Sequence, residues 1–445
     1  MRRRTALVGI AIVVLVGTAC TAGGGTSSAP TTINPSASHA PVTLTLWSFY
    51  ANPEFDKYQQ VLDMFHQQYP WITVNHVGNK SPQNIQQAIN SGTAPDVALE
   101  AGPDNSAKYC SSGAWIDLNP YIKADKINIP SVVPPAALRY TGYQGKQCSL
   151  PALSDAYGLY YNTKMLQDKG IASPPKTYSE LVADAKKLTV YNPDGSIKIA
   201  GFVPLNNFYE SAQLANGVWD GAQWYDSSGK SAFASDPKWA QLFEWQKSFI
   251  DSYGYDKLTK FYAQLGGPNS EWNAQQAFMK GKVAMALDGE WRTAFIKDFN
   301  SNVPYATAPF PVPDDRASDY GLGQIGGDMI GIPKGAPNEA AAWLLVKYLA
   351  LDTEAEVKLA TLLGNVPTTF DSLKDPAVSA DPNFATFLDI FGNPNSAYKQ
   401  ITPLGTTDTT LQGAFLSKYY AGNVPDLQAG LQQLASQIDK QTQLG

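Results

Sequence analysis

The apolar residues between positions 42 and 99 change from the spacing of a strand to that of a helix and back. Positions 42–46 and 71–77 are apolar at alternate places, as in half-buried strands. The apolar residues between them recur at helical spacing and are Phe55, Tyr58, Val61, Leu62 and Phe65. A second helix is expected over 81–92 and a short apolar strand over 94–99. This order predicts a βαβ series built on a parallel sheet.

In parallel sheets of this kind, a ligand binds beyond the carboxyl ends of the strands. Those ends are expected at Trp47–Tyr50 and Glu100–Asp104. Both stretches therefore become candidates for a binding site.

Periodicity over the rest of the chain predicts a second α/β region. Helices are expected over 178–188, 209–216, 237–250, 272–280 and 339–349, and from 410 onward. Strands are expected over 202–204, 283–287 and 323–333, with an extended, proline-rich return over 306–313. The helix over 339–349 is expected to be strongly amphipathic.

The stretch 145–166 reads as a strand that follows a bend and leads into a helix. Pro151 precedes an apolar turn, and an alternating run of Tyr and Leu follows Gly158. A chain of 445 residues is too long for one small core, so two domains are the default. We expect the chain to cross here from one lobe to the other, with a cleft at the crossing.

Composition and charge exclude several classes of protein. Charged residues make up only 16% of the chain, while Trp (10) and Tyr (23) are plentiful, which is not the composition of a disordered protein. The formal net charge is −6. Removing a leader with three arginines and no acid leaves 30 basic against 39 acidic residues. An acidic chain of this kind is a poor candidate for binding nucleic acid.

Arginine and histidine are scarce. Beyond the leader, arginine occurs only at 139, 292 and 316, whereas sites for phosphates or carboxylates usually use arginine forks. This scarcity favours a neutral ligand, although the acidic balance leaves a cation open. His39 lies in a linker, so only His66 and His76 remain for catalysis or for binding metal. We expect no cofactor and no metal site.

The N-terminus has the features of an export signal. Residues 2–4 are basic and 6–16 are continuously apolar, a run too short to span a bilayer. The next four residues, GTAC, resemble a bacterial lipobox, in which the cysteine is acylated and becomes the first mature residue. Gly17 stands where leucine is commonest, and the motif also satisfies small-x-small cleavage, so an unlipidated secreted form stays open. We favour lipidation at Cys20, because cleavage without lipidation would leave an unpaired cysteine thiol at the new N-terminus.

Two segments therefore precede the folded part of the chain. Residues 1–19 are expected to be a signal peptide. Residues 20–40 carry no charge and are rich in Gly, Ser, Thr and Pro, which predicts a lipidated flexible tether. The protein is thus expected outside the cytoplasmic membrane, anchored to its outer face.

The two other cysteines are Cys110 and Cys148. Because an exported protein is in an oxidising space, a disulfide between them is the simple expectation. The alternative is a pair of buried thiols.

Trp272 and the segment 278–291, FMKGKVAMALDGEW, combine aromatic rings with acidic residues. Sugars pack their C–H faces on aromatic rings, and their hydroxyls need polar partners. Trp291 beside Asp288 and Glu290 fits that chemistry, but a core position for Trp291 stays open. The two carboxylates also suggest a glycosidase pair, although Gly289 between them favours a solvated pair without catalysis.

Other motifs carry less chemistry. At 326–328, two glycines and Asp328 leave room for the backbone to approach a ligand, or simply form a bulge. The sequence GKS at 229–231 is not a phosphate loop, because Trp224 stands where its first glycine belongs. Calcium loops started at Asn192 or Asp220 lack the closing glutamate, and GxSxG and HExxH are not found.

The order of these motifs resembles the extracellular solute-binding proteins of carbohydrate ABC importers, the maltose-binding-protein-like family. The similarity covers nearly all of residues 42–445. The matching segments are LTLWSFY, GTAPDVAL, YGLYYNTKMLQDKGI, PPKTYSELVADAKKL, VWDGAQWYDSSGKSAF, FMKGKVAMALDGEW, PFPVPDD, GGDMIGIPKGAPNEAAAWLLVKYL and NVPTT. Each segment alone is weak, whereas their order and spacing are specific.

The resemblance implies a periplasmic-binding-protein-like α/β fold, with two lobes, three crossings and a ligand cleft between the lobes. The crossings are expected near 153–157, 311–327 and 365–367. The lobes would then comprise 41–153 plus about 312–365, and 154–311 plus about 366–445.

The resemblance also implies binding residues. They are Trp47, Ser48, Phe49, Glu100, Gly102, Tyr157, Trp219, Asp220, Gly289, Glu290, Trp291, Gly326, Gly327 and Asp328, to which we add Asn207, Tyr209 and Trp272. The implied function is capture of a mono- or oligosaccharide and its delivery by a monomer to ABC permease subunits. A secreted glycoside hydrolase and a receptor for a glycerophosphodiester or polyamine are the alternatives.

Overall fold

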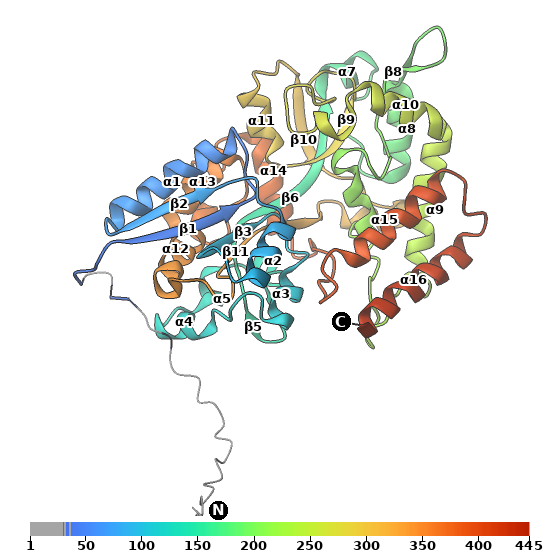
Figure 1. Ribbon diagram of the computed structural model, residues 1–445. Coiled ribbons are helices and arrows are strands. Elements are labelled where there is room, and N and C mark those ends of the chain that lie inside the picture. Colours follow the sequence, from blue (N-terminus) through green and yellow to red (C-terminus); the bar gives the residue numbers. More distant parts are fainter. Residues whose placement is uncertain (1–29, 31–32, 35–36, 445) are drawn as a thin grey trace, which may run out of the picture.

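The computed structural model describes residues 30, 33–34 and 37–444. The predicted signal peptide over 1–19, Cys20 and most of the predicted tether lie outside these residues. The described chain is built around a seven-stranded sheet, with helices distributed over two regions (Figure 1). This architecture confirms the predicted α/β fold class.

The first region begins with the predicted βαβ series. Strand β1 (Val42–Ser48) lies between β2 (Ile72–Val77) and β3 (Val97–Glu100) and is parallel to both. Helices α1 (Glu54–Gln68) and α2 (Pro82–Ser91) form the crossovers. The carboxyl ends of β1 and β3 therefore lie side by side, as the sequence predicted.

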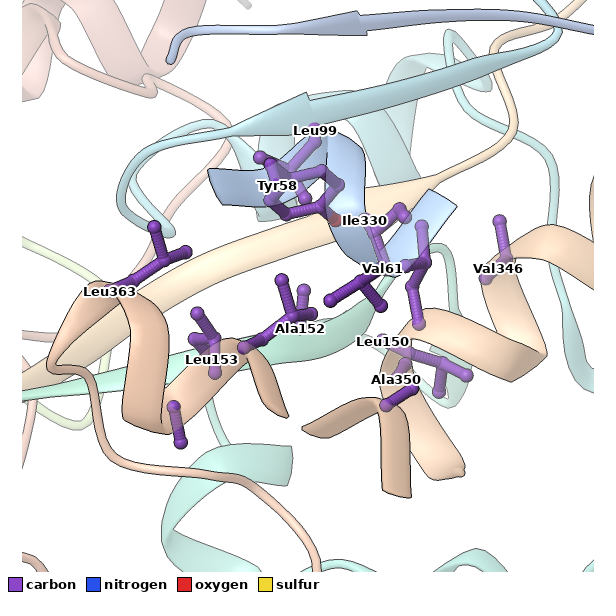
Figure 2. Close-up of a cluster of buried hydrophobic side chains, with 14 of the residues drawn as sticks. Tyr58, Val61, Leu99, Leu150, Ala152, Leu153, Ile330, Val346, Ala350 and Leu363 are labelled. Carbon is purple, nitrogen blue, oxygen red and sulfur yellow. The ribbon is translucent and has the colours of Figure 1, made fainter. Parts of the chain in front are cut away.

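Burial explains why these elements form where they do. The helical stripe predicted on α1 is buried, including Tyr58, Val61, Leu62 and Phe65. Figure 2 shows Tyr58 and Val61 of this stripe together with Leu99 of β3 and Ile330 of a neighbouring strand. A buried helix face of this kind stabilises the sheet by removing apolar area from water, at about 25 cal/mol per Å².

Helix α2 has signals at both ends. The Ser81 Oγ accepts a hydrogen bond from Asn84 N at 3.3 Å, and the Asn84 side chain accepts one from Ser81 N at 3.0 Å. Gly92 ends the helix with φ of 72°, a conformation that glycine adopts without strain. Both ends agree with the sequence prediction.

Strand β6 (Leu150–Asn162) is the strand that the two regions share. Its first half pairs antiparallel with β11 (Ile325–Gly331), which in turn pairs with β3. Its second half pairs antiparallel with β9 (Met285–Gly289) on one side and β10 (Tyr305–Pro309) on the other. The predicted crossing strand at 145–166 is therefore confirmed as one continuous strand.

The remaining elements complete both regions. The other helices are α3 (Ser106–Ser112), α4 (Asn119–Ala124), α5 (Ile129–Val132), α6 (Pro135–Leu138), α7 (Thr163–Asp168), α8 (Tyr178–Leu188), α9 (Pro237–Tyr253), α10 (Tyr255–Gln264), α11 (Arg292–Asp298), α12 (Glu339–Leu351), α13 (Thr353–Leu363), α14 (Pro382–Gly392), α15 (Thr407–Tyr420) and α16 (Leu427–Leu444). Short strands are β4 (Gly142–Tyr143), β5 (Lys146–Gln147), β7 (Val190–Tyr191) and β8 (Ile197–Ile199). The 3₁₀ turns are η1 (Tyr209–Asn216), η2 (Gly267–Ser270), η3 (Asp314–Asp319) and η4 (Ser372–Lys374). Within the described part of the chain, no helix has the length and hydrophobicity to span a membrane.

The buried apolar side chains form two main cores. The N-terminal core takes most of its residues from 44–156 and 325–391, and the C-terminal core takes most of its residues from 157–322 and 416–438. Along β6, Ala156 and Tyr160 belong to the first core and Tyr157 and Leu159 to the second, so both cores pack against this strand.

Helix α14 lies where the two cores meet. Its residues Phe387 and Ile390 belong to the N-terminal core, yet both side chains lie against Gly158, in the half of β6 that pairs with β9 and β10. Thr307 of β10 also donates a hydrogen bond to Asn383 O at 2.7 Å. The division that assigns everything after about residue 366 to the C-terminal lobe therefore stays a prediction.

Four secondary-structure predictions need correction. Residues 202–204 form no strand, and only Ala200 bridges to Val283. Residues 272–280 form turns, because the Gln276 side chain accepts hydrogen bonds from the backbone of Phe278 and Met279 in place of a helical carbonyl. Residues 209–216 form a 3₁₀ helix, and α12 is buried nearly all round, so it is not amphipathic.

The predicted disulfide between Cys110 and Cys148 is confirmed. It joins α3 to the segment that leads into β6, across 38 residues of sequence. Both cysteines are buried in a small cluster with Trp115 and Met329. The disulfide therefore ties the start of the shared strand to the first region.

Removing this disulfide should destabilise the protein. A cross-link that closes a loop of this length limits the unfolded chain, and its loss typically costs about 3 kcal/mol. We expect the double variant Cys110→Ala/Cys148→Ala to unfold at lower urea concentration than the native chain. Adding a reductant should lower the urea midpoint of the native chain but leave the double variant unchanged. Equal midpoints for all four samples would contradict this role.

Candidate ligand-binding site

A cavity of about 760 Å³ lies between residues of the two cores. On the N-terminal side, its wall is formed by the loops that follow β1 (49–54) and β3 (101–104) and by 326–328 of β11. On the C-terminal side, the wall comes mainly from η1 and the residues around Trp291. The crossing residues Asp155, Tyr157 and Asn365 lie between these two walls, together with Tyr398 and Lys399. This size is within the range of small-molecule binding sites.

Eight of the residues proposed for ligand binding line this cavity. They are Phe49, Gly102, Tyr157, Trp272, Trp291, Gly326, Gly327 and Asp328. They come from six separate parts of the chain, and the fold brings them together near the predicted strand ends and crossing.

Three candidates on the N-terminal side do not line the cavity. Ser48 and Glu100 are the last residues of β1 and β3 and remain inside the sheet, and the lining starts one residue later in each case. Ser48 Oγ is 2.7 Å from His76 Nε2, and Glu100 accepts hydrogen bonds from Tyr109 and Asn105. The Lys80 ammonium lies over the Trp47 ring, 4.3 Å from the ring centroid. Their polar and aromatic groups therefore act within the first region.

Six candidates on the C-terminal side also lie outside the lining. Asn207 is exposed. The Tyr209 hydroxyl forms a hydrogen bond with Ser270 Oγ at 2.6 Å. Trp219 is fully buried in the C-terminal core, and the Asp220 carboxylate accepts a hydrogen bond from Tyr178 at 2.9 Å. The two remaining residues, Gly289 and Glu290, are buried behind the cavity wall.

An aromatic wall forms one side of the cavity, and we use this name for Tyr157, Trp291 and Trp272. The Tyr157 and Trp291 rings meet edge to face at 5.5 Å, and Trp272 lies 6.1 Å from Trp291. Trp291 is 7% exposed and belongs to the C-terminal core, whereas Trp272 is 52% exposed. Trp291 is thus both a core residue and part of the cavity wall.

Gly289 determines how Trp291 lies. A Cβ atom at position 289 would come within 2.2 Å of the Trp291 ring, so only glycine allows this close approach. The ring therefore lies directly on the end of β9, where it can form part of the cavity wall. Gly289 acts by positioning Trp291.

Sequence reasoning missed several lining residues. Glu54, Glu210, Asn365, Tyr398 and Lys399 line the cavity but were not proposed as ligand contacts. Asn365 begins the matching segment NVPTT, and the other four belong to no recognisable motif. Their contribution arises from tertiary packing, which brings the start of α1, η1 and the connection between α14 and α15 to one place.

Burial raises the pKa of four carboxylates that line the cavity. The pKa values of Glu54, Asp155 and Glu210 are raised to about 7, chiefly by loss of water. The charge of Glu210 raises the pKa of Asp155 further. The pKa of Asp328 is well above its usual value, through burial and then through the charge of Asp155.

The three predicted crossings lie side by side. Ser154 and Val366 exchange backbone hydrogen bonds of 2.7 and 3.0 Å, and Tyr157 N donates to Gln324 O at 3.0 Å. The Asn365 side chain donates to Asp155 at 3.2 Å and to Glu290 at 3.0 Å. Movement of one crossing would therefore disturb hydrogen bonds to the others.

The carboxylates Asp288 and Glu290 do not form the solvated pair suggested by the sequence. Both are at most 1% exposed, and neither lines the cavity. Asp288 accepts a hydrogen bond from Arg292 Nε at 2.7 Å, and Glu290 accepts one from Ala156 N at 2.8 Å. Both are structural groups, and they leave no room for a substrate between them. Among the described residues, no group of His, Cys, Asp and Glu could hold a metal ion.

The buried carboxylates should make stability depend on pH. An unfolded glutamate has a pKa near 4.3, whereas the pKa of Glu210 is raised to about 7 in the folded chain, so folding favours its protonated form. The contribution of Glu210 to the free energy of unfolding is therefore greatest below about pH 4. It falls as the pH rises towards 7, by up to about 1.4 kcal/mol per pH unit.

We therefore expect a higher melting temperature at pH 5.5 than at pH 7.5. The variant Glu210→Gln should show a smaller difference between the two pH values, because one titrating group is removed. The control Glu244→Gln, at an exposed position of α9, should keep the full difference. A pH dependence that Glu210→Gln leaves unchanged would contradict this assignment.

Comparisons with known proteins agree with this architecture. Residues 60–386 match the family described as bacterial extracellular solute-binding protein. A probable ABC transporter-binding protein of Deinococcus radiodurans is 25% identical over 297 residues, 64% of this chain and 66% of that protein. The maltooligosaccharide ABC transporter solute-binding lipoprotein of Streptococcus pneumoniae is 27% identical over 275 residues, 60% of this chain and 58% of that protein. The chain therefore matches somewhat less than two thirds of the length of each of these two relatives.

A solved structure shows the same fold. The structure of CpMnBP1 with mannotriose bound superposes with a TM-score of 0.79 at 24% identity, covering 89% of this chain and 99% of that one. The related proteins are solute-binding proteins and not enzymes, which corrects the alternative of a glycoside hydrolase. Because the family match covers well over half of the chain, the protein belongs to the bacterial extracellular solute-binding proteins.

Proposed function

We propose that this protein captures a mono- or oligosaccharide outside the cytoplasmic membrane and delivers it to the permease subunits of an ABC importer. The aromatic wall is the observation that carries this proposal. Its rings offer flat apolar faces for the C–H groups of a sugar, while Asp328 and Asn365 in the same cavity can bind hydroxyls. A cavity that combines aromatic rings with carboxylates and amides suits a sugar better than a small anion.

The related proteins support a sugar as the ligand. One relative carries maltooligosaccharide in its name, and the similar structure holds mannotriose. Because loops around such a cavity vary between proteins, neither ligand transfers directly to this chain. Their shared chemistry supports the class of ligand, not its identity.

The remaining parts of the proposal concern location and assembly. Cys20 would carry the lipid anchor, and residues 20–40 would tether the binding domain to the outer face of the cytoplasmic membrane. The protein would act as a monomer and bind no nucleic acid. The adjacent crossings would act as the hinge, with the ligand favouring closure because it contacts residues on both sides.

A phosphodiester ligand is disfavoured by the lining of the cavity. No arginine lines it, and its one lysine, Lys399, already lies 3.0 Å from Asp104 and 3.4 Å from Asp408. A polyamine remains the main rival to a sugar, because the cavity is acidic.

Thermal shift measurements on the native chain test the proposal. A ligand at about 100 times its dissociation constant should add about 2.7 kcal/mol to the free energy of unfolding. We expect stabilisation by at least one sugar in a panel of sugars, polyols, phosphodiesters and polyamines, and recovery of that sugar unchanged. Stabilisation by polyamines alone, or turnover of the sugar, would contradict the proposal.

Trp291→Ala should abolish sugar binding, because it removes the ring at the centre of the aromatic wall. A buried aromatic contact of this kind is worth roughly 2 kcal/mol or more, so affinity should fall at least about 30-fold in calorimetry. Trp272→Ala should weaken binding with little effect on folding, since Trp272 is half-exposed. The control Tyr191→Ala removes an exposed aromatic ring of β7, outside the cavity lining, and should leave affinity unchanged. Unchanged affinity in both tryptophan variants would remove the aromatic wall from the binding site.

A further inference from the structure

The cavity is acidic on both sides. Glu54, Asp155 and Asp328 line it from the N-terminal side and the crossing, and Glu210 lines it from η1. Each of the last three accepts a hydrogen bond from a neutral donor: Asp155 from Asn365, Asp328 from Tyr50 and Glu210 from Gln213. Across residues 37–444, none of these four carboxylates is paired with a lysine, arginine or histidine within 4.0 Å.

Nearby cations are committed to other partners. Lys399 lines the cavity but is 2% exposed at its side chain and lies between Asp104 and Asp408. Arg292 lies behind the lining and binds Asp288, and Lys57 binds Asp298 at 2.5 Å. The partly buried Glu271 lies near Glu210, and burial followed by the charge of Glu210 raises its pKa to about 8. The cavity therefore holds four carboxyl groups that no lysine, arginine or histidine of the described chain pairs with.

A metal ion does not account for these carboxylates. Within the part of the chain that the structure describes, no three of them come close enough together to coordinate one ion. Carboxylates distributed around a cavity of about 760 Å³ suit an organic cation that spans several of them. The aromatic wall adds a second attraction, because the face of a tryptophan ring binds both a sugar ring and an ammonium group.

We propose that the preferred ligand of this cavity is an amino sugar, a mono- or oligosaccharide with a free, protonated amine. This inference rests on the proposed function and narrows the class of sugar. The amine would lie against Glu54 on the N-terminal side of the cavity, while the sugar ring packs on the aromatic wall and its hydroxyls bind the other carboxylates. An ammonium group offsets the repulsion between the carboxylates and replaces part of the hydration that they lose on burial. A hydroxyl or an acetamide at the same position supplies hydrogen bonds but no charge.

Matched sugars test the inference on the native chain by calorimetry at neutral pH. Glucosamine, N-acetylglucosamine and glucose differ only at C2, which carries an amine, an acetamide or a hydroxyl. Galactosamine, N-acetylgalactosamine and galactose form a second set of the same kind. The β-linked disaccharides of the glucose series extend the comparison to longer ligands. We expect the free amine to bind at least about tenfold more tightly than both neutral forms of the same sugar. Equal or tighter binding of the neutral forms would overturn the inference while leaving the sugar proposal intact. Binding of spermidine but of no sugar would overturn both.

Glu54→Gln provides the test in the protein. Glutamine keeps the size of the side chain and its ability to accept a hydroxyl, but it removes the charge. We expect affinity for the amine form to fall about tenfold and the preference for amine over N-acetyl sugar to shrink in proportion. The matched control is Asp56→Asn, an exposed carboxylate in the same turn of α1 that does not line the cavity, and it should keep the full preference. Equal losses for amine and neutral sugars in Glu54→Gln would overturn the inference, because a hydroxyl acceptor would explain them.

Discussion

The hydrogen bonds of β6 to two different sets of strands are the constraint on which the rest of the structure depends. Its first half is bonded to β11 and its second half to β9 and β10, so one strand belongs to both regions. Both cores pack against β6, the first through Ala156 and Tyr160 and the second through Tyr157 and Leu159. Asp155 and Tyr157, where the pairing of β6 changes from β11 to β9, both line the cavity. The cavity therefore lies at the crossing because the two sheet halves meet there.

The same crossing connects binding to possible movement of the two regions. Asn365 contacts Asp155 on β6 and Glu290 beyond β9, and all three are held by hydrogen bonds inside a buried network. A ligand that bonds to Asp155 or Asn365 would compete directly with bonds between the crossings. If the crossings act as the proposed hinge, the hinge and the proposed binding site use the same side chains, which suits a receptor that changes shape when its ligand binds.

The cavity is lined by carboxylates as well as aromatic rings. Burying carboxylates without cationic partners is costly, and their raised pKa values show that cost. A cationic group on a ligand would offset part of this cost. The scarcity of arginine, read from the sequence as favouring a neutral ligand, disfavours anions and is compatible with a cationic sugar.

The sequence alone determined the βαβ series, the crossing strand, the disulfide and the glycine beside Trp291, because each rests on local spacing or on few possible partners. It also indicated the strand ends from which Phe49 and Gly102 line the cavity. Only the tertiary structure decided that Ser48 and Glu100, one position earlier than the lining, remain inside the sheet. It also decided that Glu54, Glu210 and Lys399 meet at the cavity, since they lie far apart along the chain and belong to no motif. Local patterns specify elements and turns, whereas the facing of a side chain towards a cavity depends on how distant elements pack.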